Sequence, residues 1–177
     1  MPRPHRNPVG GVIYHVTNRA NARVGIFMND EDFRTFENVL LEALGRFAVV
    51  LLAYCLMPNH WHLVLRPDEN HGPDLPAFMH WLTSTHVRRW HRHRGTSGMG
   101  HLYQGRYRSF PVQDDPHFLN VCRYVEANAV RAQLVKSAAE WQWSSLWRRT
   151  QPAPAADMLT NWPVEKPDDW LEIVNAP

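Results

Sequence analysis

Residues 47–66 constrain the fold of this chain more than any other segment. The first ten are almost continuously apolar and rich in Val and Leu, which is typical of a strand covered on both faces. Residues 57–59 (Met-Pro-Asn) then favour a turn, and the residues after them alternate, with His60 and His62 on one face and Trp61 on the other. We therefore predict a β-hairpin whose first strand is central in a sheet.

The rest of the body alternates between strand-like and helix-like patterns. In order, it predicts a strand at residues 11–18, a helix from Asn29 to about Gly45, a helix from residue 75 whose pattern dissolves within residues 88–94, a short edge strand at residues 107–112, and a helix that begins at Asp114 and continues through Tyr124 toward Arg131. This order predicts an α+β fold of ferredoxin-like type, with a mostly antiparallel sheet and helices packed against it.

Charge divides the chain into two parts. Residues 1–149 carry 18 Lys and Arg against 12 Asp and Glu, whereas residues 150–177 carry 1 against 5. We therefore expect one domain over residues 1–149, followed by an acidic, proline-containing tail over residues 150–177 in which Trp162 and Trp170 could dock a short helix. Arginine accounts for 17 of the 19 basic residues, and its planar guanidinium suits contacts with phosphate and bases, so a nucleic-acid partner is favoured.

Other features exclude whole classes of protein. No apolar run approaches the roughly 20 residues that a membrane helix needs. The basic start of the chain lacks an apolar segment behind it, so a signal peptide is not expected and a cytoplasmic location is predicted. Cys55 and Cys122 cannot build a disulfide framework, and both are expected to be reduced in the core.

His60 and His62 are a candidate metal site. Two histidines separated by one residue on a strand point to the same face, where their imidazoles could bind one divalent ion. The intervening Trp61 would anchor the strand in the core. Taken alone the pattern is short, and two exposed strand histidines without a ligand role are the simpler interpretation.

The helix from Asp114 adds a candidate nucleophile. Its apolar residues define a buried stripe formed by Phe118, Cys122, Val125 and Ala129. The opposite stripe is polar and consists of His117, Asn120, Tyr124, Asn128 and Arg131. A tyrosine that only fills the core belongs on the first stripe, but Tyr124 lies on the second. A structural tyrosine at the edge of the core is the alternative interpretation.

A phenol, two imidazoles and an amide together suit phosphodiester transesterification. A phenol has an ordinary pKa near 10, so positive charge that favours its ionised form would help Tyr124 attack. A divalent ion on His60 and His62 would polarise the scissile phosphate. Asn128, one helical turn after Tyr124, could complete the ligand set. Attack would give a phosphotyrosine bond and a free hydroxyl, so that the ends could be rejoined without ATP.

Residues 56–64 (LMPNHWHLV) resemble the His-hydrophobic-His motif of single-tyrosine transposases, specifically the REP-associated tyrosine transposase family. Four further segments agree in order, namely residues 11–21 (GVIYHVTNRAN), 103–107 (YQGRY), 123–132 (RYVEANAVRA) and 141–145 (WQWSS). The resemblance covers about residues 9–147.

This resemblance implies a ferredoxin-like HUH nuclease fold, Tyr124 as nucleophile, Mg²⁺ or Mn²⁺ on His60 and His62, and hairpin-forming single-stranded DNA as substrate. It also implies a covalent 5′-phosphotyrosine intermediate in DNA nicking and joining. Relatives usually have Asn-Pro where this chain has Asn128-Ala129, which predicts that the helix continues. Wider HUH transposases use a Gln as third ligand, whereas Asn128 has a shorter side chain.

Arginines along the chain are expected to hold the DNA backbone. The densest basic segment is residues 88–94, and the expected contacts are Arg3, Arg6, Arg19, Arg23, Arg88, Arg89, Arg92, Arg94, Arg106, Arg108 and Arg131. Trp90, Tyr103 and Tyr107 could stack on unpaired bases. A solvated helix end is the alternative for residues 88–94, and the acidic tail either competes with DNA or is an inert extension.

The sequence is compatible with three functions. The first is a nicking and joining enzyme, a monomer or homodimer, and the second is a hairpin-DNA binding or regulatory protein that keeps the fold without cleaving. The third is a metal-dependent hydrolase built on other histidines, such as His86, His91, His93 and His101. A hydrolase site predicts carboxylates near the ligands, and none is evident beside His60 or His62.

Overall fold

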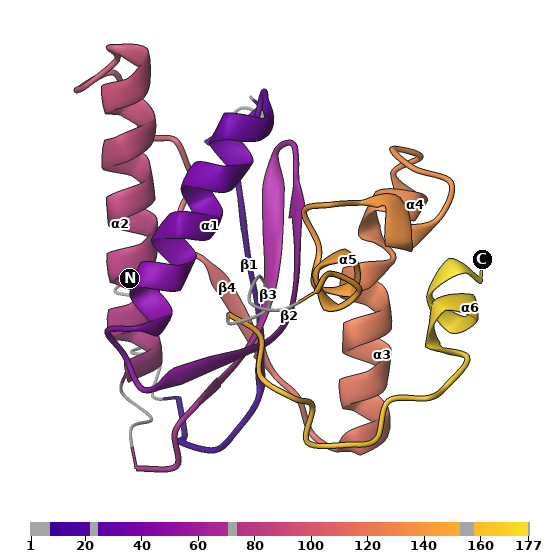
Figure 1. Ribbon diagram of the computed structural model, residues 1–177. Coiled ribbons are helices and arrows are strands. Elements are labelled where there is room, and N and C mark those ends of the chain that lie inside the picture. The colour runs from indigo at the N-terminus through magenta and orange to yellow at the C-terminus, as the bar shows by residue number, and fades with distance from the viewer. Residues whose placement is uncertain (1–7, 22–24, 71–73, 153–157, 177) are drawn as a thin grey trace.

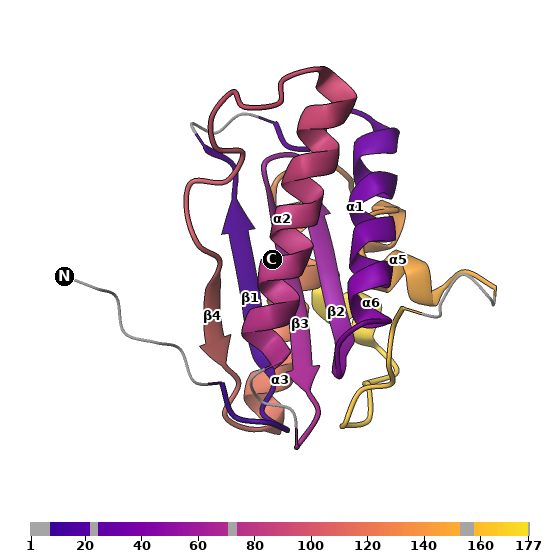
Figure 2. The same ribbon diagram turned by 90° about the vertical axis from the view of Figure 1, so that its left-hand side faces the viewer.

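A four-stranded antiparallel sheet lies at the centre of the protein, in a computed structural model that describes residues 8–21, 25–70, 74–152 and 158–176. The strands are β1 (Tyr14–Arg19), β2 (Val49–Met57), β3 (His60–Pro67) and β4 (Arg108–Pro111). They are arranged in the order β2-β3-β1-β4, which Figure 2 shows from one face of the sheet.

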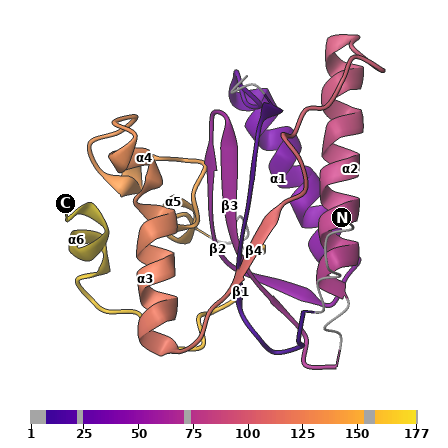
Figure 3. The ribbon, with the colours of Figure 1, turned by 180° about the vertical axis from the view of Figure 1, so that it is seen from behind.

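Helices cover both faces of this sheet. The long helices α1 (Asp30–Leu44) and α2 (Asp74–Arg94) lie on one face. The other face carries α3 (Asp115–Glu126), α4 (Asn128–Arg131), the short 3₁₀ helix η2 (Ala138–Glu140), α5 (Ser145–Arg149) and α6 (Trp170–Asn175). Figures 1 and 3 show the sheet between the two groups. The predicted α+β fold with an antiparallel sheet is confirmed.

The β2–β3 hairpin divides its side chains between two cores. Trp61 and Leu63 pack with α1 and α2 in the larger hydrophobic cluster, whereas Val64 packs against α3 in the second. This is the alternation that the sequence predicted, and it sends His60 and His62 toward α3. The hairpin is therefore the element that connects the core to the candidate site.

The prediction that the first hairpin strand is central was wrong. β2 lies at one edge of the sheet, but segments later in the chain cover its free edge. Leu51 forms an isolated bridge with Leu159, and Cys55 forms one with Ser144. The indole of Trp162 also donates a hydrogen bond to the carbonyl oxygen of Leu52 at 2.8 Å. The side chains of β2 are apolar because they pack into the hydrophobic clusters on both faces of the sheet, while these later segments cover its backbone edge.

Helix starts follow the capping residues that the sequence predicted, and α2 ends within the predicted residues. Asn29 and Asp114 each accept a hydrogen bond from a backbone N–H of the following first turn, at the starts of α1 and α3. The second helix, α2, ends at Arg94, within residues 88–94 where the sequence predicted its end. Its last turns are held by α1, since Arg94 pairs with Asp32 at 2.6 Å.

The C-terminal segment packs against α3. The rings of Trp162 and Trp170 lie 5.0 Å apart in an edge-to-face contact, and Phe118 of α3 lies 5.3 Å from Trp162. The indole of Trp170 donates to the buried carboxylate of Glu126 at 2.7 Å. The predicted docking of a short helix by these tryptophans is confirmed as α6.

The prediction that Cys55 and Cys122 lie in the core is confirmed. Both cysteines are buried and free. Among the described helices, none is long and apolar enough to cross a membrane.

Candidate active site

The register of the sheet and the position of α3 bring the predicted residues together. His60 and His62 lie on β3, on the face that α3 covers, and their ring centroids are 5.1 Å apart with the planes nearly perpendicular at 87°. Tyr124 comes from the polar stripe of α3, and its ring centroid lies 5.6 Å from that of His62 at an interplanar angle of 88°. The structure therefore places the two imidazoles and the phenol beside one another.

The helix α3 presents Tyr124 because its two stripes differ as the sequence indicated. Phe118, Cys122 and Val125 are fully buried, whereas the side chain of Tyr124 is 42% exposed. The hydroxyl of Tyr124 makes no hydrogen bond with any residue that the structure describes. A tyrosine held at the surface next to a buried histidine is accessible to a substrate from solvent.

A third histidine joins the site, and the sequence reasoning missed it. His15 of β1 stacks on His62 with ring centroids 5.1 Å apart, and its Nε2 lies 2.9 Å from His62 Nδ1. Its ring also lies 6.0 Å from that of Tyr124. The signal was present in the alternation of residues 14–19, which places His15 and Thr17 on the face opposite Tyr14 and Val16.

His60 has a different hydrogen-bond partner. Its Nδ1 lies 2.7 Å from Oδ1 of Asn59, the last residue of the hairpin turn. A carboxamide oxygen can only accept, so the proton of His60 lies on Nδ1 and the lone pair on Nε2. His62 has a comparable free atom, since its Nε2 is buried and has no hydrogen-bond partner among the described residues.

Burial keeps these imidazoles neutral. Desolvation lowers the pKa of His60 to about 4, and Arg19 nearby acts in the same direction. Desolvation lowers the pKa of His62 well below its ordinary value, with smaller contributions from His15, His60 and Arg19. Burial, followed by repulsion from His117, lowers the pKa of His15 to about 4. Neutral imidazoles are the form that binds metal ions.

The donor set fits a divalent ion in part. Two neutral histidines with free Nε2 atoms on one face are suitable ligands. The described residues contain no cluster of three or more His, Cys, Asp or Glu that could hold a metal. The side-chain nitrogen of Asn128, the expected third ligand, donates to the carbonyl oxygens of Tyr124 and Val125 at 2.8 and 3.2 Å, so this amide closes the end of α3.

The helix that carries Tyr124 ends earlier than predicted. α3 stops at Glu126, and the separate turn α4 begins at Asn128. The hydrogen bonds from Asn128 to carbonyls of the last turn give the chain a local alternative to continuing the helix. Arg131 of α4 nevertheless returns to the site, with its guanidinium carbon 5.1 Å from the centroid of the Tyr124 ring.

The predicted DNA-binding arginines fall into distinct groups. Arg3, Arg6 and Arg23 lie outside the described residues. Arg89 makes two hydrogen bonds with the carboxylate of Glu42, at 2.7 and 2.9 Å, and Arg94 is paired with Asp32. Exposed side chains without an ion pair to any described residue are those of Arg19, Arg88, Arg92, Arg106, Arg108 and Arg131.

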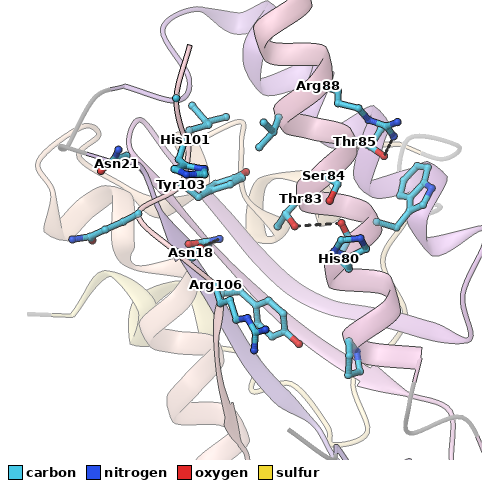
Figure 4. A pocket seen from close by; sticks show the side chains of 18 residues that line it. Asn18, Asn21, His80, Thr83, Ser84, Thr85, Arg88, His101, Tyr103 and Arg106 are labelled. Carbon is cyan, nitrogen blue, oxygen red and sulfur yellow. Dashed lines mark hydrogen bonds between the residues drawn. The ribbon is translucent and has the colours of Figure 1, made fainter. Parts of the chain in front are cut away.

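A long groove runs on the other face of the sheet, between α2 and residues 100–107 (Figure 4). Asn18, His80, Arg88 and Arg106 contribute polar atoms to its lining. Tyr103, which the sequence suggested as a base-stacking residue, is buried and hydrogen-bonded at the base of this groove, so that suggestion was wrong. The groove gives a partly basic cleft of mixed polar and apolar lining next to the end of β1.

The other histidines do not form a second metal centre. His86 is buried, with its Nδ1 2.7 Å from the hydroxyl of Tyr103. The Nδ1 of His91 lies 2.8 Å from the hydroxyl of Thr96. Since no metal-binding cluster is found among the described residues, which include all four candidate histidines, the structure gives the hydrolase alternative no support.

The sequence and the fold were compared with known proteins. Residues 8–128 match the family model described as "Transposase IS200 like". A solved structure of a REP-associated tyrosine transposase bound to a REP hairpin has a TM-score of 0.70 and 15% identity, covering 95% of this chain and 94% of that chain. A putative transposase from Deinococcus radiodurans R1 has a TM-score of 0.49 and 20% identity, covering 75% and 92%. A comparison with curated proteins found no match.

Proposed function

Since the chain belongs to the IS200-like transposase family, we propose that it cuts and rejoins single-stranded DNA with Tyr124 as the nucleophile. The observation that carries this proposal is the placement of Tyr124, whose half-exposed phenol lies beside the buried His62. A solvent-accessible phenol next to an unpartnered imidazole nitrogen that can bind a metal ion is suited to attack on a phosphodiester.

His60 and His62 would hold a divalent ion, Mg²⁺ or Mn²⁺, through their Nε2 atoms. The fit rests on two observations, namely the unpartnered Nε2 of His62 and the contact with Asn59 that leaves Nε2 of His60 free. Such an ion supplies charge stabilisation to the non-bridging oxygens of the scissile phosphate. Asn128 as a third ligand remains a prediction, because its amide nitrogen is engaged by carbonyl oxygens of α3.

The chemical step follows from the phenol. The Tyr124 oxygen attacks the phosphorus, a bond forms between them, and the phenolic proton is lost to solvent. The bond from phosphorus to the 3′ oxygen breaks, and that oxygen takes up a proton to leave as a free 3′ hydroxyl. The 5′ phosphate stays on Tyr124, and attack by a 3′ hydroxyl reverses the step and releases the phenol. Arg131, next to the ring, supplies positive charge to the site during the attack.

Hairpin-forming DNA is the proposed substrate. The solved relative with the same fold is bound to a REP hairpin, and this chain offers exposed arginines around the site and along the groove of Figure 4. Phosphate contacts from Arg19, Arg106 and Arg108 would position the strand without reading its sequence. The division at residue 150, a monomer or homodimer state and a cytoplasmic location stay predictions.

The test is a covalent adduct. The chain is incubated with end-labelled single-stranded hairpin DNA and Mn²⁺ and then separated on a denaturing gel, where a labelled band at the mass of the protein plus DNA is expected. Tyr124→Phe should lose this band, and Tyr14→Phe, a matched control on the opposite face of the sheet and outside the groove, should keep it. Absence of the band in every variant, together with tight hairpin binding, would instead support the non-cleaving DNA-binding function.

A further inference from the structure

We propose that His15 is a positioning residue that sets the tautomer of His62. In this arrangement Nε2 of His15 accepts a hydrogen bond from the Nδ1–H of His62, and His62 keeps its lone pair on Nε2. The inference rests on the proposed function in so far as that lone pair is meant for a divalent ion. It extends the site to β1, the strand next to β3.

The contact is specific. His15 Nε2 and His62 Nδ1 are 2.9 Å apart, and the two rings are stacked with an interplanar angle of 22°. One nitrogen must donate and the other accept, because neutral imidazole has one of each. The exposed fraction of His62 is only 5%, so water does not replace this partner freely.

The direction of the hydrogen bond follows from the other end of the ring. If His15 donated, His62 would carry its proton on Nε2, a buried atom with no acceptor among the described residues. That arrangement would bury an N–H group without a hydrogen-bond acceptor, and it would leave no lone pair on Nε2 to bind a cation. If His15 accepts, the buried atom is a lone pair, which is what a metal ion binds.

His60 supplies an internal precedent. Its Nδ1 faces the Oδ1 of Asn59, which can only accept, so its Nε2 is fixed as a lone pair. The two ring planes cross at 87°. Under the proposal, both histidines present Nε2 because each has an acceptor behind Nδ1, an amide oxygen for His60 and the His15 imidazole for His62.

A purely structural role for His15 makes a different prediction. His15 also lies 6.2 Å from the ring of Phe110, and a side chain that only packs there could be replaced by an apolar one without changing the proton on His62. The proton position on His62 therefore separates the two roles, and it can be observed without catalysis.

The first experiment reads the tautomer in the metal-free chain. Protein carrying Tyr124→Phe and ¹⁵N-labelled histidine is examined at neutral pH by two-bond ¹H–¹⁵N correlation spectra, with His62→Gln used to assign the ring. The expected result is Nδ1–H on His62. In His15→Leu, the Nε2–H form should become the major one, whereas His15→Gln, whose side-chain oxygen can accept, should retain Nδ1–H. A wild-type ring with Nε2–H, or an unchanged ring in His15→Leu, would overturn the proposal.

The second experiment measures Mn²⁺ binding to the same proteins by calorimetry. Removing the partner of a metal-binding histidine commonly weakens affinity by about 10- to 100-fold, so His15→Leu is expected to show a loss of this size and His15→Gln a much smaller one. Thermal unfolding of each variant confirms that it is folded, and equal affinities for the wild type and His15→Leu would overturn the proposal. A chain that shows Nδ1–H on His62 and binds Mn²⁺ but forms no DNA adduct would overturn the proposed function and support this role for His15.

Discussion

A histidine and a tyrosine meet on each face of the sheet, and the two pairs differ in how their polar atoms are used. On the α2 side, Nδ1 of His86 lies 2.7 Å from the hydroxyl of Tyr103, which also accepts a hydrogen bond from the indole of Trp61 at 3.0 Å. On the α3 side, His62 and Tyr124 are in ring contact only. The first pair is joined by a hydrogen bond inside the core, whereas the second leaves a buried nitrogen and a surface hydroxyl without a partner among the described residues.

The two histidine–tyrosine pairs also differ in their exposure to solvent. His86 is 1% exposed and Tyr103 8%, but Tyr124 is 42% exposed while its neighbour His62 is buried. A buried polar network that is fully satisfied contributes stability and fixes the packing of the core. An incompletely satisfied pair at the surface costs stability unless a ligand uses its atoms. The comparison therefore indicates a structural role for His86 and Tyr103, and it supports the proposed catalytic role of His62 and Tyr124.

The largest expected effect comes from removing one hydroxyl on the α3 side. Tyr124→Phe should reduce the rate of DNA adduct formation by at least about 10³-fold, because loss of a nucleophile removes the covalent route. Its thermal unfolding should match that of the wild type, since this hydroxyl bonds to no described residue. Single-turnover cleavage assays and circular dichroism measure the two quantities. A destabilised variant that still cleaves would reverse the assignment of the two pairs.

The stability of the protein at low pH should report on the buried pair formed by His86 and Tyr103. Desolvation lowers the pKa of His86 from 6.5 to about 3, with Asp32 opposing and Arg94 adding to the shift. The unfolded chain therefore takes up a proton near pH 6.5 and the folded chain only near pH 3, so the free energy of unfolding falls as the pH drops through this window. The His86 contribution to this fall is roughly 4–5 kcal/mol, and above pH 6.5 it is absent.

Urea unfolding between pH 3 and pH 7 measures this dependence. Desolvation also lowers the pKa values of the half-buried His15 and His60, so the relevant quantity is the difference between the wild type and His86→Leu. That difference should grow as the pH falls. Parallel curves for the two proteins would contradict a neutral, buried His86.

The sequence revealed the α3 pair better than the α2 pair, and the reason is physical. Strand alternation and helical periodicity are local, so they correctly placed His60, His62 and Tyr124 on facing surfaces. Asn29 and Asp114 marked helix starts for the same reason, since an N-cap acts within one turn. Tyr103 lies in an irregular segment, where no period indicates which side chains are buried.

Two differences depend on contacts between distant segments. β2 is an edge strand, but its side chains pack into the clusters on both faces of the sheet, and Leu159 and Trp162 cover its edge, so its sequence resembles that of a central strand. His15 joins the site through the pairing of β1 with β3, a register that neither strand specifies alone.

A smaller effect is expected from the hydroxyl on the α2 side. Tyr103→Phe leaves the indole N–H of Trp61 and the Nδ1 of His86 without their shared partner, which should lower the free energy of unfolding by about 1–3 kcal/mol. Adduct formation by the folded protein should be retained. Chemical denaturation and the gel assay together test this, and loss of cleavage in a fully folded Tyr103→Phe protein would show that the two faces are functionally coupled.

The smallest expected effect extends the same distinction to the arginines. Arg89 is engaged by Glu42 through two hydrogen bonds, whereas Arg106 is exposed in the lining of the groove and has no ion pair with the described residues. If open polar groups are the ones that serve a ligand, Arg106→Ala should weaken hairpin binding several-fold and reduce the slope of log affinity against log salt by about 1.

Arg89→Ala is the matched control and should leave that slope nearly unchanged, because its guanidinium is neutralised within the protein. Fluorescence anisotropy with a labelled hairpin at several salt concentrations measures both slopes. Equal reductions would show that the ion pair with Glu42 opens on binding. The distinction between side chains that are bonded within the protein and side chains that are open to a ligand would then apply to the two histidine–tyrosine pairs but not to the arginines.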